Sequence, residues 1–219
     1  MARLIDLSHA IEEGMITYKG FPGPHLCDYW TRDASAAHYD DGSSFHIGRI
    51  DMIANTGTYV DSPFHRYADG ADLAALPLES LADLDALVVR KPFERGLATD
   101  AADFEGDVRG KAVLVHTGWD RHWRTDTYFD SHPFLTAAAA EWLVEQGAAF
   151  VGIDSHNIDD TRTRSRPVHS KLLAAGIPIG EHLTNLGAVP DHGFRFSAVP
   201  PKMVGMGTFP VRAYARVAE

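Results

Sequence analysis

Residues 55–65 read NTGTYVDSPFH, and the rest of the chain is best interpreted outward from this stretch. In an extended segment, side chains alternate between two faces with a period of two. The stretch therefore places Asn55, Tyr59 and Asp61 on one face, where they offer an amide, a phenol and a carboxylate. Pro63 ends the extended segment and fixes the turn that follows it.

Asp61 and His65 bring a carboxylate and an imidazole to the same corner of the chain, four residues apart. Such a pair can form half of a metal site or can move protons in acid–base catalysis. The structural alternative is an Asp that caps a turn beside a partly buried His. The spacing alone leaves both interpretations open.

The stretch resembles the signature of the metal-dependent cyclase family, which includes bacterial kynurenine formamidases and isatin hydrolases. The family pattern reads His-x-Gly-Thr-His-x-Asp-x-Pro-x-His. The chain is similar to the family in two further segments, Asp-Leu-Ser at residues 6–8 and Thr-Gly-Trp at residues 117–119. Five of the seven fixed positions of the pattern are kept, namely Gly57, Thr58, Asp61, Pro63 and His65.

The two departures from this pattern fall on family metal ligands, because Asn55 and Tyr59 stand where the family has His. An amide offers only a neutral carbonyl oxygen. A phenol, whose ordinary pKa is about 10, is a poor ligand until a cation acidifies it. We therefore expect a weakened metal site, with Asn55 contacting substrate and Tyr59 taking part in catalysis.

His169 and Glu181 supply the second half of the expected site. They lie twelve residues apart, separated by a predicted helix, a Gly turn and a short strand. This spacing also permits a surface His in a first helical turn. The resemblance implies a functional pair, since the family has a His and a Glu at this separation before a Leu-x-Asn-Leu segment, which residues 183–186 match.

The resemblance thus implies that Asp61, His169 and Glu181 bind a divalent metal, and that His65, Tyr59 and Glu181 are catalytic. Asp61, His65, His169 and Glu181 together offer two imidazoles and two carboxylates. This donor set suits Zn²⁺ or Mn²⁺ by ligand type. We expect one of these two ions as the cofactor.

Arg162, Arg164 and Arg166 form a basic run in an otherwise acidic chain. The ordinary explanation is a solvated face. The alternative is an anion clamp, because arginine grips carboxylates through two parallel hydrogen bonds. The run lies a few residues before His169, which favours the clamp, so these three arginines join Asn55 as expected substrate-binding residues.

The composition is that of an ordinary globular protein of 219 residues, with 45% hydrophobic and 10% aromatic residues. This length predicts one domain, residues 1–219. A formal net charge of -10 argues against nucleic acid and anionic membranes as partners. The single Cys27, the lack of a leader pattern and the lack of any apolar run near about 18 residues predict a protein of the cytoplasm.

The predicted elements alternate between strand and helix. The apolar runs 112–116 and 148–153 predict buried strands, and a Thr cap and a Gly delimit a helix at Ala137–Gln146. Pro167 starts a further helix that ends at Gly176. The polar stretch 31–44 is expected to be a mobile loop near the site. This pattern predicts a mixed α/β class, and the resemblance implies the swivelling β/β/α fold, with mixed sheets and helices between strands.

Three functions are compatible with these residues. The first, which the resemblance favours, is an arylformamidase-like hydrolase that cleaves an amide, formamide or lactone bond of a small anionic metabolite, with His65 moving the proton. The second is a metal-free cyclase, isomerase or dehydratase that uses Tyr59 and His65. The third is a non-catalytic family member. The resemblance also implies a homodimer or homotetramer. Three further histidines, His46, His116 and His156, are interpreted as structural.

Overall fold

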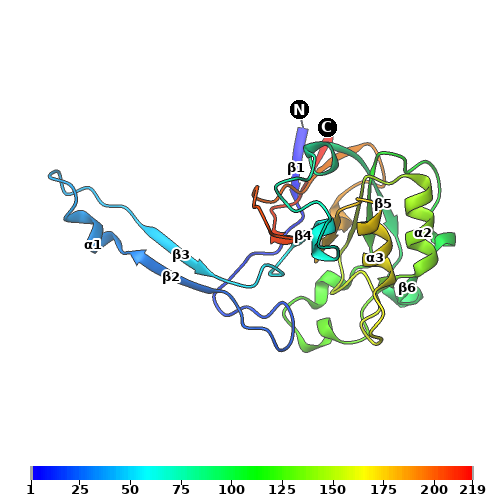
Figure 1. Cartoon of the computed structure of the whole chain (residues 1–219), viewed down its shortest axis with the longest axis horizontal. Helices are drawn as coiled ribbons and strands as arrows, with labels where there is room; N and C mark the ends of the chain where they lie inside the picture. The colour runs from blue at the N-terminus through cyan, green and yellow to red at the C-terminus, as the bar shows by residue number, and fades with distance from the viewer. Residues whose placement is uncertain (1, 219) are drawn as a thin grey trace.

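The computed structural model describes residues 2–218, which are organised around a nine-stranded mixed sheet (Figure 1). Its strands, in chain order, are β1 (Ala2–Asp6), β4 (Tyr59–Asp61), β5 (Leu84–Arg90), β7 (Ala112–His116), β9 (Phe150–Ile153), β10 (Ile179–Glu181), β11 (Phe194–Ser197), β12 (Thr208–Pro210) and β13 (Tyr214–Ala218). Across the sheet they lie in the order β1-β13-β11-β5-β7-β9-β10-β4-β12. Strands from the two ends of the chain are therefore neighbours.

The central strands β5, β7, β9 and β10 run parallel, and the flanking strands pair antiparallel. A parallel strand covered on both faces needs apolar residues throughout. The run from Ala112 to Val115 meets this need, since all four residues are fully buried. The buried strands predicted at 112–116 and 148–153 are confirmed as β7 and β9.

Successive residues of β7 pack into two different cores, because strand side chains alternate between the faces of a sheet. Leu114 joins the core on one face, together with Phe150 and Phe196. Val113 joins the core on the other face, together with Leu143 of the helix described next. The sheet thus separates two apolar layers.

Two helices cover the second of these layers and pack against each other: α2 (Ala137–Gln146) and α3 (Pro167–Ala174) (Figure 1). The Thr136 hydroxyl accepts the backbone N–H of Ala139 at the start of α2, and Gly147 ends the helix with a φ of 75°. Glycine adopts this left-handed conformation without strain. The bounds predicted for α2, the Pro start of α3 and the mixed α/β class are confirmed.

A long arm projects from this body (Figure 1). It consists of β2 (His25–Trp30) paired antiparallel with β3 (Ile47–Asp51), and α1 (Arg32–Ala36) lies at its far end. The prediction of a loop near the site at residues 31–44 is wrong, because these residues lie toward the tip of the arm. Residues 47–51 form β3, whose partner is the local β2, so the pair extends outward.

A separate two-stranded sheet joins β6 (Ala98–Thr99) to β8 (Phe134–Leu135), and short 3₁₀ turns make several of the remaining connections. The two strands of this small sheet pair in parallel, which holds the segment before α2 against residues 98–99. Among residues 2–218, no helix combines the length and the apolar character that crossing a bilayer requires.

Candidate active site

A cavity of about 480 Å³ lies where β4, β10, the start of α3 and the segment after β9 meet. The predicted site residues Asn55, Tyr59, Asp61, His65, Arg166, His169 and Glu181 all line it. Five residues that were not predicted from the sequence complete the lining: Tyr18, Phe21, His156, Asn157 and Thr161. Residues spread over most of the chain are thus brought to one space.

The register of β4 and β10 aligns the phenol with the carboxylate, because Tyr59 pairs directly with Glu181 in the antiparallel ladder. Directly paired residues project to the same face of a sheet. The extended segment is shorter than predicted, since only residues 59–61 form a strand. Gly57 has a φ of 64° and breaks the extension, yet Asn55 still reaches the cavity.

Asp61 is completely buried, and one of its two carboxylate oxygens has no partner. Its Oδ1 accepts a hydrogen bond from the Thr208 hydroxyl. Its Oδ2 has no hydrogen-bond partner among the described residues and lies 3.6 Å from Nε2 of His169. A buried carboxylate oxygen without a partner is costly, so this atom marks a position where a cation or a donor belongs.

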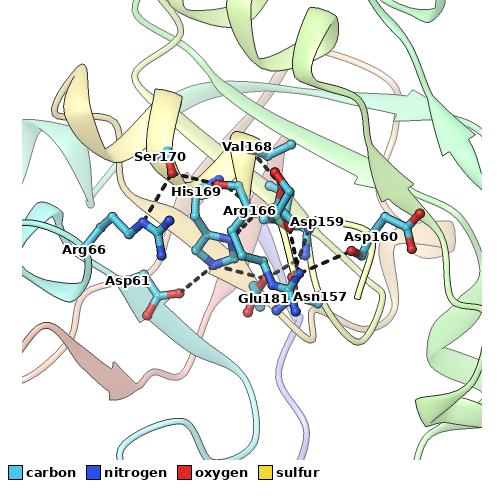
Figure 2. A network of polar contacts seen from close by, with 12 residues as sticks. Asp61, Arg66, Asn157, Asp159, Asp160, Arg166, Val168, His169, Ser170 and Glu181 are labelled. Atoms are coloured by element: carbon cyan, nitrogen blue, oxygen red, sulfur yellow. Dashed lines mark hydrogen bonds and ion pairs between the residues drawn. The ribbon is translucent and has the colours of Figure 1, made fainter. Parts of the chain in front are cut away.

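His169 is held in one orientation by Asp159 (Figure 2). Oδ2 of Asp159 lies 2.7 Å from Nδ1 of His169 and accepts the backbone N–H of the same residue at 3.0 Å, while Oδ1 accepts the N–H of Val168 at 2.8 Å. Because both oxygens of Asp159 act as acceptors here, Nδ1 of His169 is the donor and Nε2 is directed into the cavity. Carboxylate support of this kind is typical of metal-binding histidines.

The charge around His169 favours a cation. Burial on its own lowers the pKa of His169, but the carboxylates of Glu181, Asp159 and Asp61 outweigh it and raise that pKa to about 10. The carboxylates that hold a proton on the imidazole would equally attract a metal ion in its place. Proton and metal therefore compete for Nε2.

Glu181 is fully buried at the end of β10 and is surrounded by donors. Its Oε1 accepts the backbone N–H of Ile158 at 2.7 Å, and its Oε2 accepts the phenol of Tyr59 and lies 3.2 Å from the hydroxyl of Tyr18. Burial raises the pKa of Glu181, and so does the charge of Asp61. Burial and the charge of Glu181 raise the pKa of both Tyr59 and Tyr18, so the two phenols stay protonated donors.

The donors around His169 fit a divalent metal. Nε2 of His169 lies 3.6 Å from Oδ2 of Asp61 and 3.6 Å from Oε1 of Glu181. Ligands on one zinc ion, with bonds of about 2.1 Å in tetrahedral geometry, lie about 3.4 Å apart. Asp61, His65 and His169 also offer ligand atoms within 4.8 Å of one another. Two sets of three donors are therefore possible. Both contain Asp61 and His169, and the third donor is Glu181 in one set and His65 in the other.

His65 differs from the other donors in its exposure. Its side chain is 35% exposed, against 7% for His169 and 1% for Asp61. Its Nδ1 lies 2.9 Å from the Thr208 hydroxyl oxygen and 3.5 Å from Oδ1 of Asp61. His65 is therefore held at one nitrogen while its ring remains open to the cavity and to water, as the movement of a proton requires.

The three arginines of the basic run lie in different environments. Arg166 lines the cavity, and its Nη1 donates to the backbone carbonyl oxygens of Thr163 at 2.8 Å and Ser165 at 2.7 Å. Arg162 forms an ion pair with Asp160 at 2.8 Å, is exposed and does not line the cavity. Arg164 is also exposed and outside the cavity lining. Only one of the three expected substrate-binding arginines is thus at the site.

The cavity lining that sequence reasoning missed is mainly aromatic. Tyr18 comes from a loop rich in Gly and Pro, where no spacing relates it to Glu181. His156, interpreted from the sequence as structural, lines the cavity, and burial lowers its pKa to about 3. A usable signal existed for Asn157 and its neighbours, since residues 154–157 follow a parallel strand and ligands bind at the carboxyl ends of such strands.

Comparison with known proteins identifies the family of this chain. The model of the family named Cyclase, described as "Putative cyclase", matches residues 5–160. The chain belongs to the Cyclase family. This Cyclase chain is 32% identical to a kynurenine formamidase from Erythrobacter litoralis, and the match covers 92% of this chain and 88% of that one. It is 28% identical to a kynurenine formamidase from Geobacillus thermodenitrificans, and that match covers 97% of this chain and 96% of the relative. The resemblance read from residues 55–65 is confirmed.

Solved structures share the fold of this Cyclase chain. Isatin hydrolase A from Labrenzia aggregata superposes with a TM-score of 0.84 at 19% identity, covering 100% of this chain and 94% of that one. A protein described as a potential metal-dependent hydrolase with cyclase activity has a TM-score of 0.75 at 25% identity, with both chains covered completely. The predicted swivelling β/β/α fold and the prediction of an enzyme of the hydrolase type are confirmed.

Proposed function

We propose that this Cyclase chain is a metal-assisted hydrolase that resembles an arylformamidase. Its substrate would be a small anionic metabolite, in which it cleaves an amide or formamide C–N bond or a lactone C–O bond. The observation that carries the proposal is the unpartnered Oδ2 of buried Asp61, which lies 3.6 Å from the supported imidazole of His169. The kynurenine formamidases among its relatives favour an amide-type bond.

Asp61, His169 and Glu181 would hold a Zn²⁺ or Mn²⁺ ion, as their donor types and separations allow. When bound, the ion would polarise the scissile carbonyl and acidify a water molecule. Asp159 keeps Nε2 of His169 directed inward through its bond to Nδ1. Thr208 anchors Asp61 and His65 together through one hydroxyl.

The remaining residues of the site handle the proton and the substrate. His65, with its ring partly open to the cavity, takes the proton from the attacking water and returns it to the leaving nitrogen or oxygen. Asn55, His156 and Phe21 also line the cavity, where they can position the substrate. The hydrogen bond from Tyr59 to Glu181 holds this carboxylate in place.

The same hydrogen bond weighs against a metal-free enzyme. A phenol that stabilises an oxyanion must direct its O–H toward the substrate. Tyr59 is only 1% exposed, and its hydroxyl donates to Glu181. The O–H of Tyr59 is therefore engaged in a hydrogen bond to Glu181 and is not directed at the substrate. A metal-assisted reaction explains this arrangement better than a metal-free one.

Metal binding and hydrolysis together test this function. We expect purified protein to bind Zn²⁺ or Mn²⁺ in equilibrium dialysis and to hydrolyse a formylated aniline. Asp61→Asn should reduce metal affinity by at least about 100-fold and abolish hydrolysis, because it removes the central anionic ligand. Asp130→Asn, at an exposed carboxylate outside the cavity lining, is the matched control. Hydrolysis that persists in Asp61→Asn, or in metal-free protein, would refute the proposal.

A further inference from the structure

A second hollow of about 120 Å³ adjoins the cavity, and every side chain that lines it carries an N–H donor. The two spaces share His65, Asn157, Arg166 and His169, and the smaller one adds Arg66. No carboxylate lines it, although the chain has a net charge of -10. A hollow that is lined by two arginines and no carboxylate, next to a reaction site, is suited to an anion.

The two arginines of this hollow have no carboxylate partner. Among residues 2–218, neither Arg66 nor Arg166 forms an ion pair, whereas Arg162 in the same turn is paired with Asp160. A positive charge that is left uncompensated beside a cavity is available to an anionic ligand.

Both guanidinium groups are also anchored by neutral oxygens. Nη1 of Arg166 donates to backbone carbonyls of the turn before α3, including Thr163 at 2.8 Å. Nε of Arg66 donates to the Ser170 hydroxyl at 3.2 Å. In Figure 2 the His169 ring lies between the two arginine side chains. The anchors fix the positions of the two groups, and other N–H donors remain for a ligand.

We infer that Arg66 and Arg166, together with Asn157, form a subsite for a carboxylate that the substrate carries a few bonds away from the scissile carbonyl. The inference rests on the proposed function, because it places the scissile bond at Asp61 and His169. The hollow shares His169 with that position, so the two substrate groups must be close together in the molecule. The volume of about 120 Å³ suits a planar carboxylate.

A matched pair of substrates tests the subsite. N-formylanthranilate and formanilide contain the same formamide bond and differ in one ortho carboxylate. We expect Arg66→Gln to raise the KM for N-formylanthranilate by about 10-fold to 100-fold more than the KM for formanilide, since a hydrogen bond to a charged group is lost. Arg166→Gln should act in the same direction. Arg162→Gln, outside the hollow, is the control and should not change the ratio of the two KM values.

Benzoate binding provides a readout that does not depend on turnover. Calorimetric titration should show that Arg66→Gln weakens benzoate binding about 10-fold or more, while Arg162→Gln does not. If neither formamide is hydrolysed but benzoate binding shows this dependence, the hydrolase proposal fails and the subsite stands. Equal KM values for both formamides, or benzoate binding that is insensitive to Arg66, would overturn the subsite. Inorganic phosphate that binds more tightly than benzoate would also overturn the assignment to a carboxylate.

Discussion

At the scale of single residues, Asn55 and Tyr59 distinguish this chain from the family pattern. Tyr59 occupies a buried position opposite Glu181 and donates its phenol to that carboxylate. Oε2 of Glu181 is therefore occupied by the phenols of Tyr59 and Tyr18, while Oε1 accepts the N–H of Ile158 and also lies 3.6 Å from Nε2 of His169. The substitution leaves the donors for one ion in place, namely Asp61, His169 and Glu181.

Returning imidazoles to these positions should strengthen the site. In the double variant Asn55→His, Tyr59→His, we expect tighter Zn²⁺ or Mn²⁺ binding and faster hydrolysis of a formylated aniline. The reason is that two imidazoles, which are good metal ligands, replace a neutral amide and a phenol. Dialysis with elemental analysis measures the binding, and Tyr59→Phe is the control that removes the phenol without adding a ligand. Tighter metal binding with unchanged hydrolysis would contradict the hydrolase function.

His9 predicts a pH dependence of stability. Its ring stacks on Trp123 with centroids 4.0 Å apart, and burial, partly opposed by the charge of Asp120, lowers its pKa from 6.5 to about 4. The unfolded chain thus binds a proton at pH 5 that the folded chain does not, so stability falls as the pH drops from 6.5 toward 4. The loss from this residue is about 2 kcal/mol at pH 5.

The variant His9→Phe keeps a ring for stacking and removes this titration. Its free energy of unfolding should decrease less between pH 7 and pH 5 than that of the unchanged protein. Guanidinium unfolding at the two pH values measures the difference. Parallel pH dependence in the two proteins would show that His9 does not contribute.

At the scale of elements, the cap of α2 gives a stability prediction. The Thr136 hydroxyl accepts the N–H of Ala139 at 3.1 Å and donates to Asp100 at 2.7 Å. Thr136→Ala should lower the free energy of unfolding by about 1 kcal/mol, as measured by chemical denaturation. Thr127→Ala, at an exposed position outside the helices α1–α3, is the control. An equal loss in both variants would contradict the assigned role of the cap.

Local signals made α2, β7 and β9 predictable, because caps, Pro and apolar runs act within a few residues. The fold class and most of the candidate site followed from the motif around Asp61 and its resemblance to the family. Other features depend on contacts that no local pattern encodes. Tyr18 reaches Glu181 across 163 positions of the chain, and Arg66 meets Ser170 across 104. The arm was missed for the same reason, since the polarity of residues 31–44 predicts a loop but not where that loop lies.

At the scale of the whole molecule, the β2–β3 arm exposes an unusual amount of apolar surface. Ile50 is 63% exposed and Tyr29 is 64% exposed, and every residue of β3 is exposed. An isolated two-stranded ribbon is at best marginally stable in water. Arg49 and Asp51 lie on one face of β3 and form no ion pair among residues 2–218. A two-fold axis through Ile50 would bring each of them to its opposite charge.

We therefore propose that a second copy of the chain covers the arm, which gives the expected homodimer or homotetramer. Light scattering at micromolar concentration should show an oligomer, and Ile50→Asp should dissociate it, because it places a charge at the centre of the contact. Val204→Asp, at an 85% exposed position off the arm, is the control. A monomeric wild-type protein, or an oligomer unaffected by Ile50→Asp, would refute this arrangement.

The sheet order also has a consequence for synthesis on the ribosome. β1 pairs with β13, and β4 pairs with β10 and β12, so the earliest strands emerge long before their partners. Asp61 meets Thr208 only after 147 further residues have been added. A nascent chain must keep these strands unpaired until translation is nearly complete, a state in which open edges invite aggregation. A product truncated before β12 lacks the Thr208 hydroxyl that anchors Asp61, so we expect it to be inactive.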